Sequence, residues 1–193
     1  MNDSDRIVSS ESEELILVDD GDNEIGFASK ADCHDGEGAL HRAFSVFLFN
    51  PQGELLLQRR AAGKRLWPGY WSNSCCSHPR RGETLIEATR RRLNDELNLD
   101  AELEFVYHFS YQAVFGDAGA EHELCHVFLG RVDGAVDYNR SEIDAVRFVS
   151  TDELARGLEG DASVYTPWLK LEWQELNERF AERLAAYTRV QPT

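Results

Sequence analysis

Lysine is scarce in this sequence, and basic side chains as a whole are outnumbered. Three of the 20 basic residues are lysine, and 35 acidic residues give the chain a formal net charge of −15 at pH 7. A protein that coats nucleic acid or an anionic membrane needs a basic surface. The charge balance therefore argues against nucleic acid and membranes as partners.

The use of arginine in place of lysine on an acidic chain resembles the composition of proteins from salt-accumulating cytoplasm. At about 1 M salt the screening length is roughly 3 Å, so like charges hardly repel one another. At low salt the same charges oppose the compact state. The composition predicts a halophilic, salt-adapted protein, with ordinary acidity as the alternative.

Long apolar runs are missing as well. No stretch approaches the length of a membrane span, and the start of the chain has no basic patch followed by an apolar segment. Residues 1–14 are polar and acidic, and we expect a flexible tail there. The four cysteines form no C-x-x-C pair, so we expect reduced thiols in a cytoplasmic protein, either buried or catalytic.

Residues 15–190 have the length and hydrophobic content of one folded domain. Residues 61–82 are rich in Gly and Trp and predict a long ordered loop, a feature that is usually functional. Strand-like and helix-like runs do not alternate regularly, which predicts an α/β (α+β) fold with a mixed sheet. No long apolar stripe demands a partner, so we expect a monomer. We expect strands near 15–18, 25–27, 43–49, 54–58, 103–115, 121–129 and 146–149, and helices at 83–97, 151–156 and 167–187.

Residues 77–99 resemble a degenerate Nudix box, whose pattern is Gly, five residues, Glu, seven residues, Arg-Glu-apolar-any-Glu-Glu-any-Gly-apolar. In Nudix hydrolases the glutamates of the box bind the divalent cations of diphosphate cleavage, so their loss here argues against hydrolysis. On the box alone, a surface helix of mixed charge is the alternative. The matching positions are Glu83, Arg91, Leu93, Glu96 and Leu99, and the departures are Ser77, Arg92, Asp95 and Asn98.

A longer signature lies at Trp67–Pro79 (WPGYWSNSCCSHP). It resembles the W-P-G-x-W-T-N-S-x-C-G-H-P signature of type 1 isopentenyl-diphosphate isomerases, which are Nudix-fold enzymes that move a double bond. The resemblance covers about residues 15–185 in order, and its further motifs are 40–45, 59–64, 121–123 and 166–168. It implies a single Nudix-fold catalytic domain, a mixed sheet sandwiched between helices. The implied activity is the interconversion of isopentenyl and dimethylallyl diphosphate in isoprenoid biosynthesis.

That reaction delivers a proton to an unactivated alkene carbon and removes another from the allylic position, through a carbocation-like intermediate. It needs an acid and a base that face the carbon skeleton in a site closed to water. By resemblance, Cys76 and Glu123 are the two proton-transfer residues, on opposite faces of the substrate. Tyr111 matches a tyrosine that hydrogen-bonds this glutamate, and Trp168 matches a tryptophan whose ring stabilises the cation. The order of the two proton transfers stays open.

The resemblance also implies two metal sites. Glu121 and Glu123 are two residues apart and therefore share one face if the segment is a strand. Imidazole with carboxylate suits Zn²⁺ or Mn²⁺, and Mg²⁺ is a further candidate. A Mg²⁺ that arrives with the diphosphate is expected on Glu96 and on the backbone carbonyl of Cys76. The first site matches the family set His34, His41, His78, Glu121 and Glu123.

A basic cluster is expected to hold the diphosphate. Two of the three lysines belong to it, and it would supply charge-assisted hydrogen bonds to phosphate oxygens. Scattered solvated charges are the alternative. The resemblance assigns Lys30, Arg60, Lys64 and Arg92 to this cluster, and Ser77, which replaces a family glycine beside Cys76, to the same substrate-binding group.

Three other functions compete with the isomerase. His122–His126 matches H-E-x-x-H, the zinc-protease motif, which works only on a helix. The residues of this short segment, which lies between glycines, follow an alternating pattern, so a strand is expected. On a strand, Glu123 would lie on the face opposite His122 and His126. A Nudix hydrolase of a diphosphate-linked substrate is the second alternative, and a non-catalytic diphosphate-binding module is the third.

Overall fold

The computed structural model describes residues 6–190 of the chain. Within this part, nine strands form one mixed β-sheet. Five α-helices and two short 3-10 turns, η2 (Gly116–Ala118) and η3 (Ala162–Val164), complete it. The strands are β1 (Glu14–Val18), β2 (Glu24–Ser29), β3 (His41–Phe49), β4 (Leu55–Arg60), β5 (Trp71–Ser72), β6 (Cys75–Ser77), β7 (Leu103–Val114), β8 (Ala120–Arg131) and β9 (Ile143–Val149). The α-helices are α1 (Lys30–His34), α2 (Leu85–Leu97), α3 (Thr151–Gly160), α4 (Pro167–Arg179) and α5 (Ala181–Thr188).

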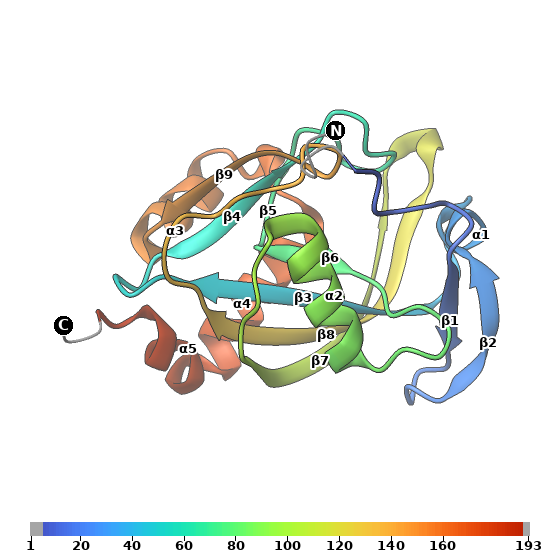
Figure 1. The fold of residues 1–193 in the computed structure, drawn as a ribbon, viewed down its shortest axis with the longest axis horizontal. Helices are drawn as coiled ribbons and strands as arrows, with labels where there is room; N and C mark the ends of the chain where they lie inside the picture. Colours follow the sequence, from blue (N-terminus) through green and yellow to red (C-terminus); the bar gives the residue numbers. More distant parts are fainter. Residues whose placement is uncertain (1–5, 191–193) are drawn as a thin grey trace.

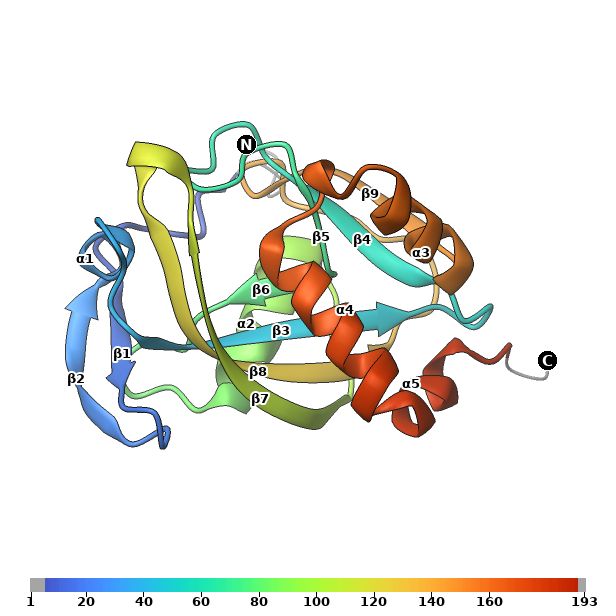
Figure 2. The ribbon, with the colours of Figure 1, turned by 180° about the vertical axis from the view of Figure 1, so that it is seen from behind.

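Strand β3 is the centre of the sheet. It pairs in parallel with β8 from His41–Glu123 to Phe49–Arg131, and antiparallel with β6, where Ser45 lies opposite Cys76. Helix α2 covers one face of these strands (Figure 1), and α4 crosses the other face (Figure 2). The expected fold, a mixed sheet sandwiched between helices, is confirmed.

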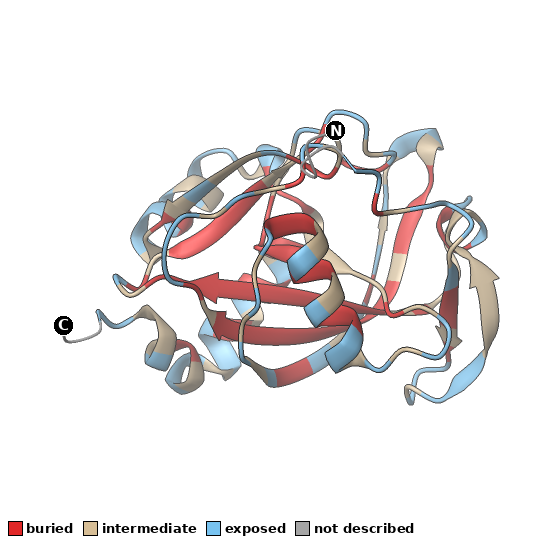
Figure 3. Cartoon of the chain, in the orientation of Figure 1, coloured by how far each residue is buried: buried red, intermediate tan, exposed pale blue. Residues whose placement is uncertain are grey.

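The two faces of the sheet carry separate cores. Phe44, Val46 and Leu48 alternate along β3 with Phe47 and Phe49, and the two sets belong to different buried clusters. The first set packs with residues of α2, and the second packs with α4. The continuous burial of β3 and β8 is seen in Figure 3. Because side chains alternate, neighbouring residues of one strand face different helices.

Helix α2 ends at Leu97 as the sequence predicts, and it begins at Leu85, two residues after the expected start. Thr84 and Glu87 form a capping box at its start, and Asn98 closes it in the left-handed conformation at φ 50. Arg92 and Glu96, four residues apart, lie on its buried face. The helix therefore presents a charged pair, as well as apolar residues, to the interior.

The expected helix at 167–187 is wrong as a single element. The chain leaves helical geometry at Phe180 (φ −124, ψ 25), and α5 follows α4 after this break. The Phe180 ring stacks on Tyr107 of β7, with centroids 4.8 Å apart and planes at 6°. The free energy gained by packing this ring against the sheet outweighs the free energy lost by interrupting the helix. Helix α3 also differs, since it runs past the expected end at 156 to Gly160.

The N-terminal segment lies against the body of the protein where the structure describes it. Residues 1–5 of the expected 1–14 tail are outside the described part. Arg80 donates to Glu13 Oε1 at 2.6 Å, and Arg6 pairs with Asp95 at 3.2 Å. Residue 14 opens β1. No helix in residues 6–190 has the length and apolar character that crossing a membrane requires.

Candidate active site

A cavity of about 500 Å³ opens above the sheet, and the N-terminal segment, α1, the 61–70 loop, β6, β7, β8 and α4 all contribute to its wall. His41 and Glu96 are the two predicted site residues that do not line it, because His41 is fully buried and Glu96 lies behind Arg92. The predicted residues that do line it are Lys30, His34, Arg60, Lys64, Cys76, Ser77, His78, Arg92, Tyr111, Glu121, Glu123 and Trp168.

The five residues of the expected His/Glu set come together from α1, β3, β8 and the turn after β6. One ligand atom from each lies within 4.8 Å of the others. His34 Nε2 is 2.9 Å from Glu121 Oε2, and His78 Nε2 is 2.8 Å from Glu123 Oε1. The set is His34, His41, His78, Glu121 and Glu123.

The histidines of this cluster are oriented by the backbone. The Nδ1 atoms of His34 and His41 contact the carbonyl oxygens of Lys30 and Ala39 at 2.6 and 2.7 Å. A ring that donates through Nδ1 leaves the Nε2 lone pair free for a metal. His41 Nε2 is buried and has no hydrogen-bond partner. Burial lowers the pKa of His41 to about 4, so its ring is neutral at pH 7, and the cluster fits a divalent metal.

Glu123 belongs to this cluster and also faces the cavity. Its Oε2 accepts a hydrogen bond of 2.6 Å from the hydroxyl of Tyr111. Burial and the neighbouring carboxylate of Glu121 raise the pKa of Glu123 well above its usual range. A carboxyl group in this setting holds a proton readily, as general acid–base chemistry requires.

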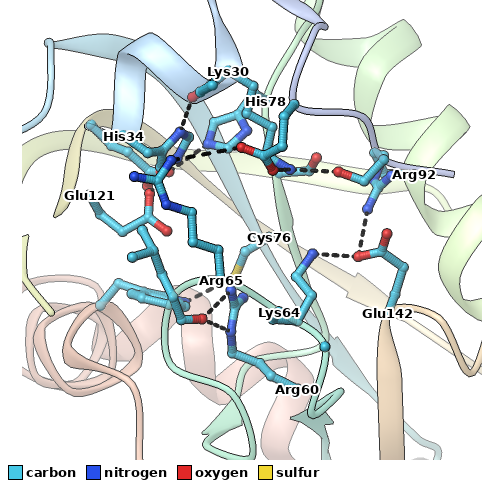
Figure 4. Close-up of a pocket in the computed structure, with 18 of the residues that line it drawn as sticks. Lys30, His34, Arg60, Lys64, Arg65, Cys76, His78, Arg92, Glu121 and Glu142 are labelled. Atoms are coloured by element: carbon cyan, nitrogen blue, oxygen red, sulfur yellow. Dashed lines mark hydrogen bonds and ion pairs between the residues drawn. The ribbon is translucent and has the colours of Figure 1, made fainter. Parts of the chain in front are cut away.

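Cys76 lies at the centre of the cavity in Figure 4. Its thiol donates to Asn73 Oδ1 at 2.7 Å and accepts from Trp168 Nε1 at 3.2 Å. Burial, with the carboxyl of Glu172 as the next cause, raises the pKa of this thiol. Cys75 is fully buried in the core on the α2 side, so the two adjacent cysteines have different surroundings.

Lys64 and Arg92 line the cavity on the side away from His34 and Glu121, whereas Lys30 lies beside His34 (Figure 4). Lys64 Nζ is 2.5 Å from Glu142 Oε2, and Arg92 Nη2 is 3.5 Å from the same oxygen. Arg92 also holds Glu96 at 2.5 Å. In this arrangement carboxylates occupy the positions that an anionic ligand would take.

Lys30 and Arg60 complete the predicted cationic set. Lys30 Nζ donates to Ser9 Oγ at 2.5 Å, and Arg60 donates to the carbonyl of Leu66 at 2.9 Å. The Arg60 guanidinium also lies over the Trp168 ring, 5.2 Å from its centroid. The cavity thus combines an aromatic wall, a cationic wall and two proton-holding groups.

Comparisons with known proteins agree with this geometry. The NUDIX domain family matches residues 39–169. The chain is 40% identical over 174 residues to Isopentenyl-diphosphate Delta-isomerase 1 of Photorhabdus laumondii, covering 89% of this chain and 99% of that protein. It is 45% identical over 157 residues to Isopentenyl-diphosphate Delta-isomerase 2 of Aromatoleum aromaticum, with 81% and 82% covered.

The chain belongs to the isopentenyl-diphosphate Delta-isomerase family. Among solved structures, DR0079 from Deinococcus radiodurans has a TM-score of 0.65 at 23% identity, with 92% of this chain and 100% of that one covered. A MutT protein from Methanosarcina mazei has a TM-score of 0.59 at 19% identity, with 74% and 96% covered. These two structures share the fold of the isomerase family.

The protease alternative is excluded within this isomerase fold. His122 and His126 lie on β8, a strand, and not on the helix that H-E-x-x-H requires. His122 contacts the carbonyl of Gly38, and His126 contacts Asp22, so neither ring joins the cluster around Glu123.

Several residues of the isomerase cavity were not found from the sequence. Asn73 does not line the cavity but accepts the hydrogen bond of the Cys76 thiol, and its place inside the quoted signature carried a signal for this contact. Arg65, which we did not assign to the site, lines the cavity next to Lys64. Glu142 and the N-terminal Ile7, Ser9 and Glu11 also line the cavity, and no local pattern marks them.

Proposed function

We propose that the chain interconverts isopentenyl diphosphate and dimethylallyl diphosphate in isoprenoid biosynthesis, with Cys76 and Glu123 as its proton-transfer residues. The observation that carries the assignment is that both groups line one cavity whose other wall is cationic. The thiol and the carboxyl come from β6 and β8, so they approach the cavity from different strands. A hydrocarbon chain held between them would meet one proton-transfer group on each side.

The proton chemistry follows from the surroundings of the two groups. One group delivers a proton to the terminal alkene carbon, and the other removes a proton from the allylic carbon. Tyr111 holds Glu123 by its hydroxyl, and Trp168 holds the sulfur of Cys76 by its indole N–H. The indole ring of Trp168 would also stabilise positive charge on the carbon skeleton.

The diphosphate would bind at the cationic wall. Lys30, Lys64 and Arg92 point toward one region, where Glu142 and Ser9 now accept their hydrogen bonds or ion pairs. Phosphate oxygens form stronger, multiply charged contacts with these groups and would displace such partners. Arg60 and Ser77 line the same cavity and complete the proposed substrate-binding set.

We assign a divalent metal, Mn²⁺ or Zn²⁺ with Mg²⁺ as a further candidate, to the His/Glu cluster. The mixed imidazole and carboxylate donors and the unpartnered His41 Nε2 support this assignment. A metal held there supplies positive charge beside Glu123 and fixes its position. A Mg²⁺ that accompanies the diphosphate is assigned to Glu96 and the carbonyl of Cys76, and Arg92 would have to release Glu96 first.

NMR in D₂O tests the assignment directly. Purified protein is mixed with isopentenyl diphosphate and Mg²⁺ in high-salt D₂O. Dimethylallyl diphosphate that carries deuterium is the expected product, because one transferred proton comes from an exchangeable enzyme group. Release of phosphate would instead support the Nudix hydrolase, and an unchanged substrate would support a diphosphate-binding module.

The setting of the enzyme is also a proposal. All four cysteines are free thiols, which supports a reducing cytoplasm. We propose a monomer, since no long apolar stripe in the sequence requires burial against a second chain. Size-exclusion chromatography with light scattering tests this, and a dimer mass would contradict it.

A further inference from the structure

Glu172 is a fully buried carboxyl that the mechanism above does not use. It lies in α4, one turn after Trp168, so both side chains project from the same face of the helix. Its relative exposure is 0%, and its Oε2 has no hydrogen-bond partner. Burial raises the pKa of Glu172 to about 8.

A short series of polar groups joins this carboxyl to Cys76. Ser45 lies directly opposite Cys76 in the β3–β6 pair, and its Oγ is 3.5 Å from the Cys76 sulfur. The thiol of Cys125 is 3.4 Å from both Ser45 Oγ and Glu172 Oε1. Ser45 and Cys125 both lower the pKa of Glu172 by hydrogen bonding, although burial prevails. Glu172 therefore contacts Cys125, which in turn contacts the Ser45 hydroxyl beside the Cys76 sulfur.

Burial of the Glu172 carboxyl lowers the stability of the fold, and the need to fill space does not explain why a carboxyl is present there. The buried neighbours of Glu172 on α4 include Leu169, Trp173 and Leu176, which are apolar. A carboxyl with an unpartnered oxygen at such a position destabilises the fold relative to a leucine of similar size. Groups retained at a cost to stability concentrate at functional sites.

We propose that Glu172 is a positioning residue for the isomerisation, because it holds the thiol of Cys125 and, through Cys125 and the hydroxyl of Ser45, the sulfur of Cys76. A hydroxyl has one hydrogen and two lone pairs, so a fixed partner on one side decides what it presents to the other. Without Glu172 the Cys125 thiol loses its carboxyl partner, and the Ser45 hydroxyl beside the Cys76 sulfur is held less firmly. The inference rests on the proposed isomerase function.

The test compares Glu172→Leu and Glu172→Gln with Glu178→Leu, a control on the exposed part of the same helix. We expect Glu172→Leu to lower kcat about tenfold to a hundredfold with KM unchanged, since small displacements of catalytic groups have effects of this size. Its Tm should stay or rise. Glu172→Gln, which keeps hydrogen-bonding atoms in the same shape, should retain most of the rate, and Glu178→Leu should match the wild type.

A second measurement does not depend on turnover. Cys76 is partly exposed whereas the other three cysteines are buried, so its alkylation by iodoacetamide can be followed by mass spectrometry. We expect Glu172→Leu to change this rate and Ser45→Ala to change it equally, with no further change in the double variant. Unchanged labelling and kcat in Glu172→Leu, or a fall in kcat matched by a fall in Tm in both Glu172 variants, would overturn the proposal. An inactive wild type would overturn the function instead.

Discussion

At the scale of single residues, the adjacent Cys75 and Cys76 are expected to have different roles, Cys75 in stability and Cys76 in catalysis. Cys75 packs on the α2 side of the sheet, and Cys76 faces the cavity. We expect Cys76→Ala to lower kcat by a factor of about 10² to 10⁴ with no loss of Tm, because this is the range that general acid–base groups contribute. Cys75→Ala should lower Tm through a small cavity and leave kcat nearly unchanged. Steady-state kinetics and thermal melts of both variants check this, and an active Cys76→Ala protein would refute the role.

The histidine cluster gives a second prediction at this scale. We expect the wild type to bind one divalent metal and His41→Ala to lose at least tenfold in affinity, because a ligand is removed from a closed set. His122→Ala is the matched control, since His122 contacts a backbone carbonyl outside the cluster. Titration calorimetry with Mn²⁺ and Zn²⁺ measures both affinities, and equal losses in the two variants would contradict the site.

The protonation states of the residues in this cluster determine whether its metal affinity rises or falls with pH. His41 has its pKa lowered to about 4 by burial, so no proton leaves it on metal binding at pH 7. The pKa of Glu123 is raised by burial and by Glu121, and, although burial opposes it, Glu121 also raises the pKa of His34, so a metal competes with protons at both groups. Affinity should therefore fall as the pH falls, with proton release on binding. Calorimetry in buffers of different ionisation enthalpy measures this release, and its absence would contradict the state assigned to Glu123.

At the scale of elements, the N-terminal segment lies over cations of the proposed diphosphate site. Glu11 lies 4.0 Å from Lys30 Nζ and 3.9 Å from Arg65 Nη1. We expect Glu11→Gln to lower KM about twofold to threefold at low salt, the range of an exposed ion pair, and to have no effect at about 1 M salt. Glu14→Gln is the control, because Glu14 pairs with Arg81 outside the cavity. Steady-state kinetics at two salt concentrations measure this effect. An unchanged KM of Glu11→Gln at low salt would contradict competition between Glu11 and the diphosphate.

The elements also explain what the sequence could predict. Four members of the His/Glu set were predictable because they occur in quoted motifs, and His34 was assigned by family resemblance alone. The strand spacing of Glu121 and Glu123 put both on one face. Glu142 and Glu172 were not predictable, since neither belongs to a quoted motif. They reach the site through pairing of β9 with β4 and packing of α4 on the sheet. The break at Phe180 was missed for the same reason, because its cause is a ring contact with β7 and not a local breaker.

At the scale of the whole molecule, the charge of the surface opposes the charge of the ligand. A chain of net charge −15 repels a diphosphate at long range, whereas the cavity collects Lys30, Arg60, Lys64 and Arg92. At 0.15 M salt the screening length is about 8 Å, so repulsion between the diphosphate and distant surface charges is largely screened. Contacts inside the cavity are weakened much less. Recognition of the diphosphate is therefore expected to be local, at the wall where two of the three lysines lie.

The same charge sets how stability depends on salt. Self-repulsion among the acidic groups destabilises the compact state in dilute buffer and is removed when the screening length becomes short. We expect KCl between about 0.05 and 2 M to stabilise the fold by about 2 kcal/mol and to raise Tm by about 4–8 °C, given the shift per kcal/mol of chains this long. Thermal melts followed by circular dichroism measure the effect. Sorbitol at equal osmolality is the control, because it acts without screening and should not reproduce the salt curve. A Tm that does not change with KCl would contradict salt adaptation and leave ordinary acidity as the reason for the composition.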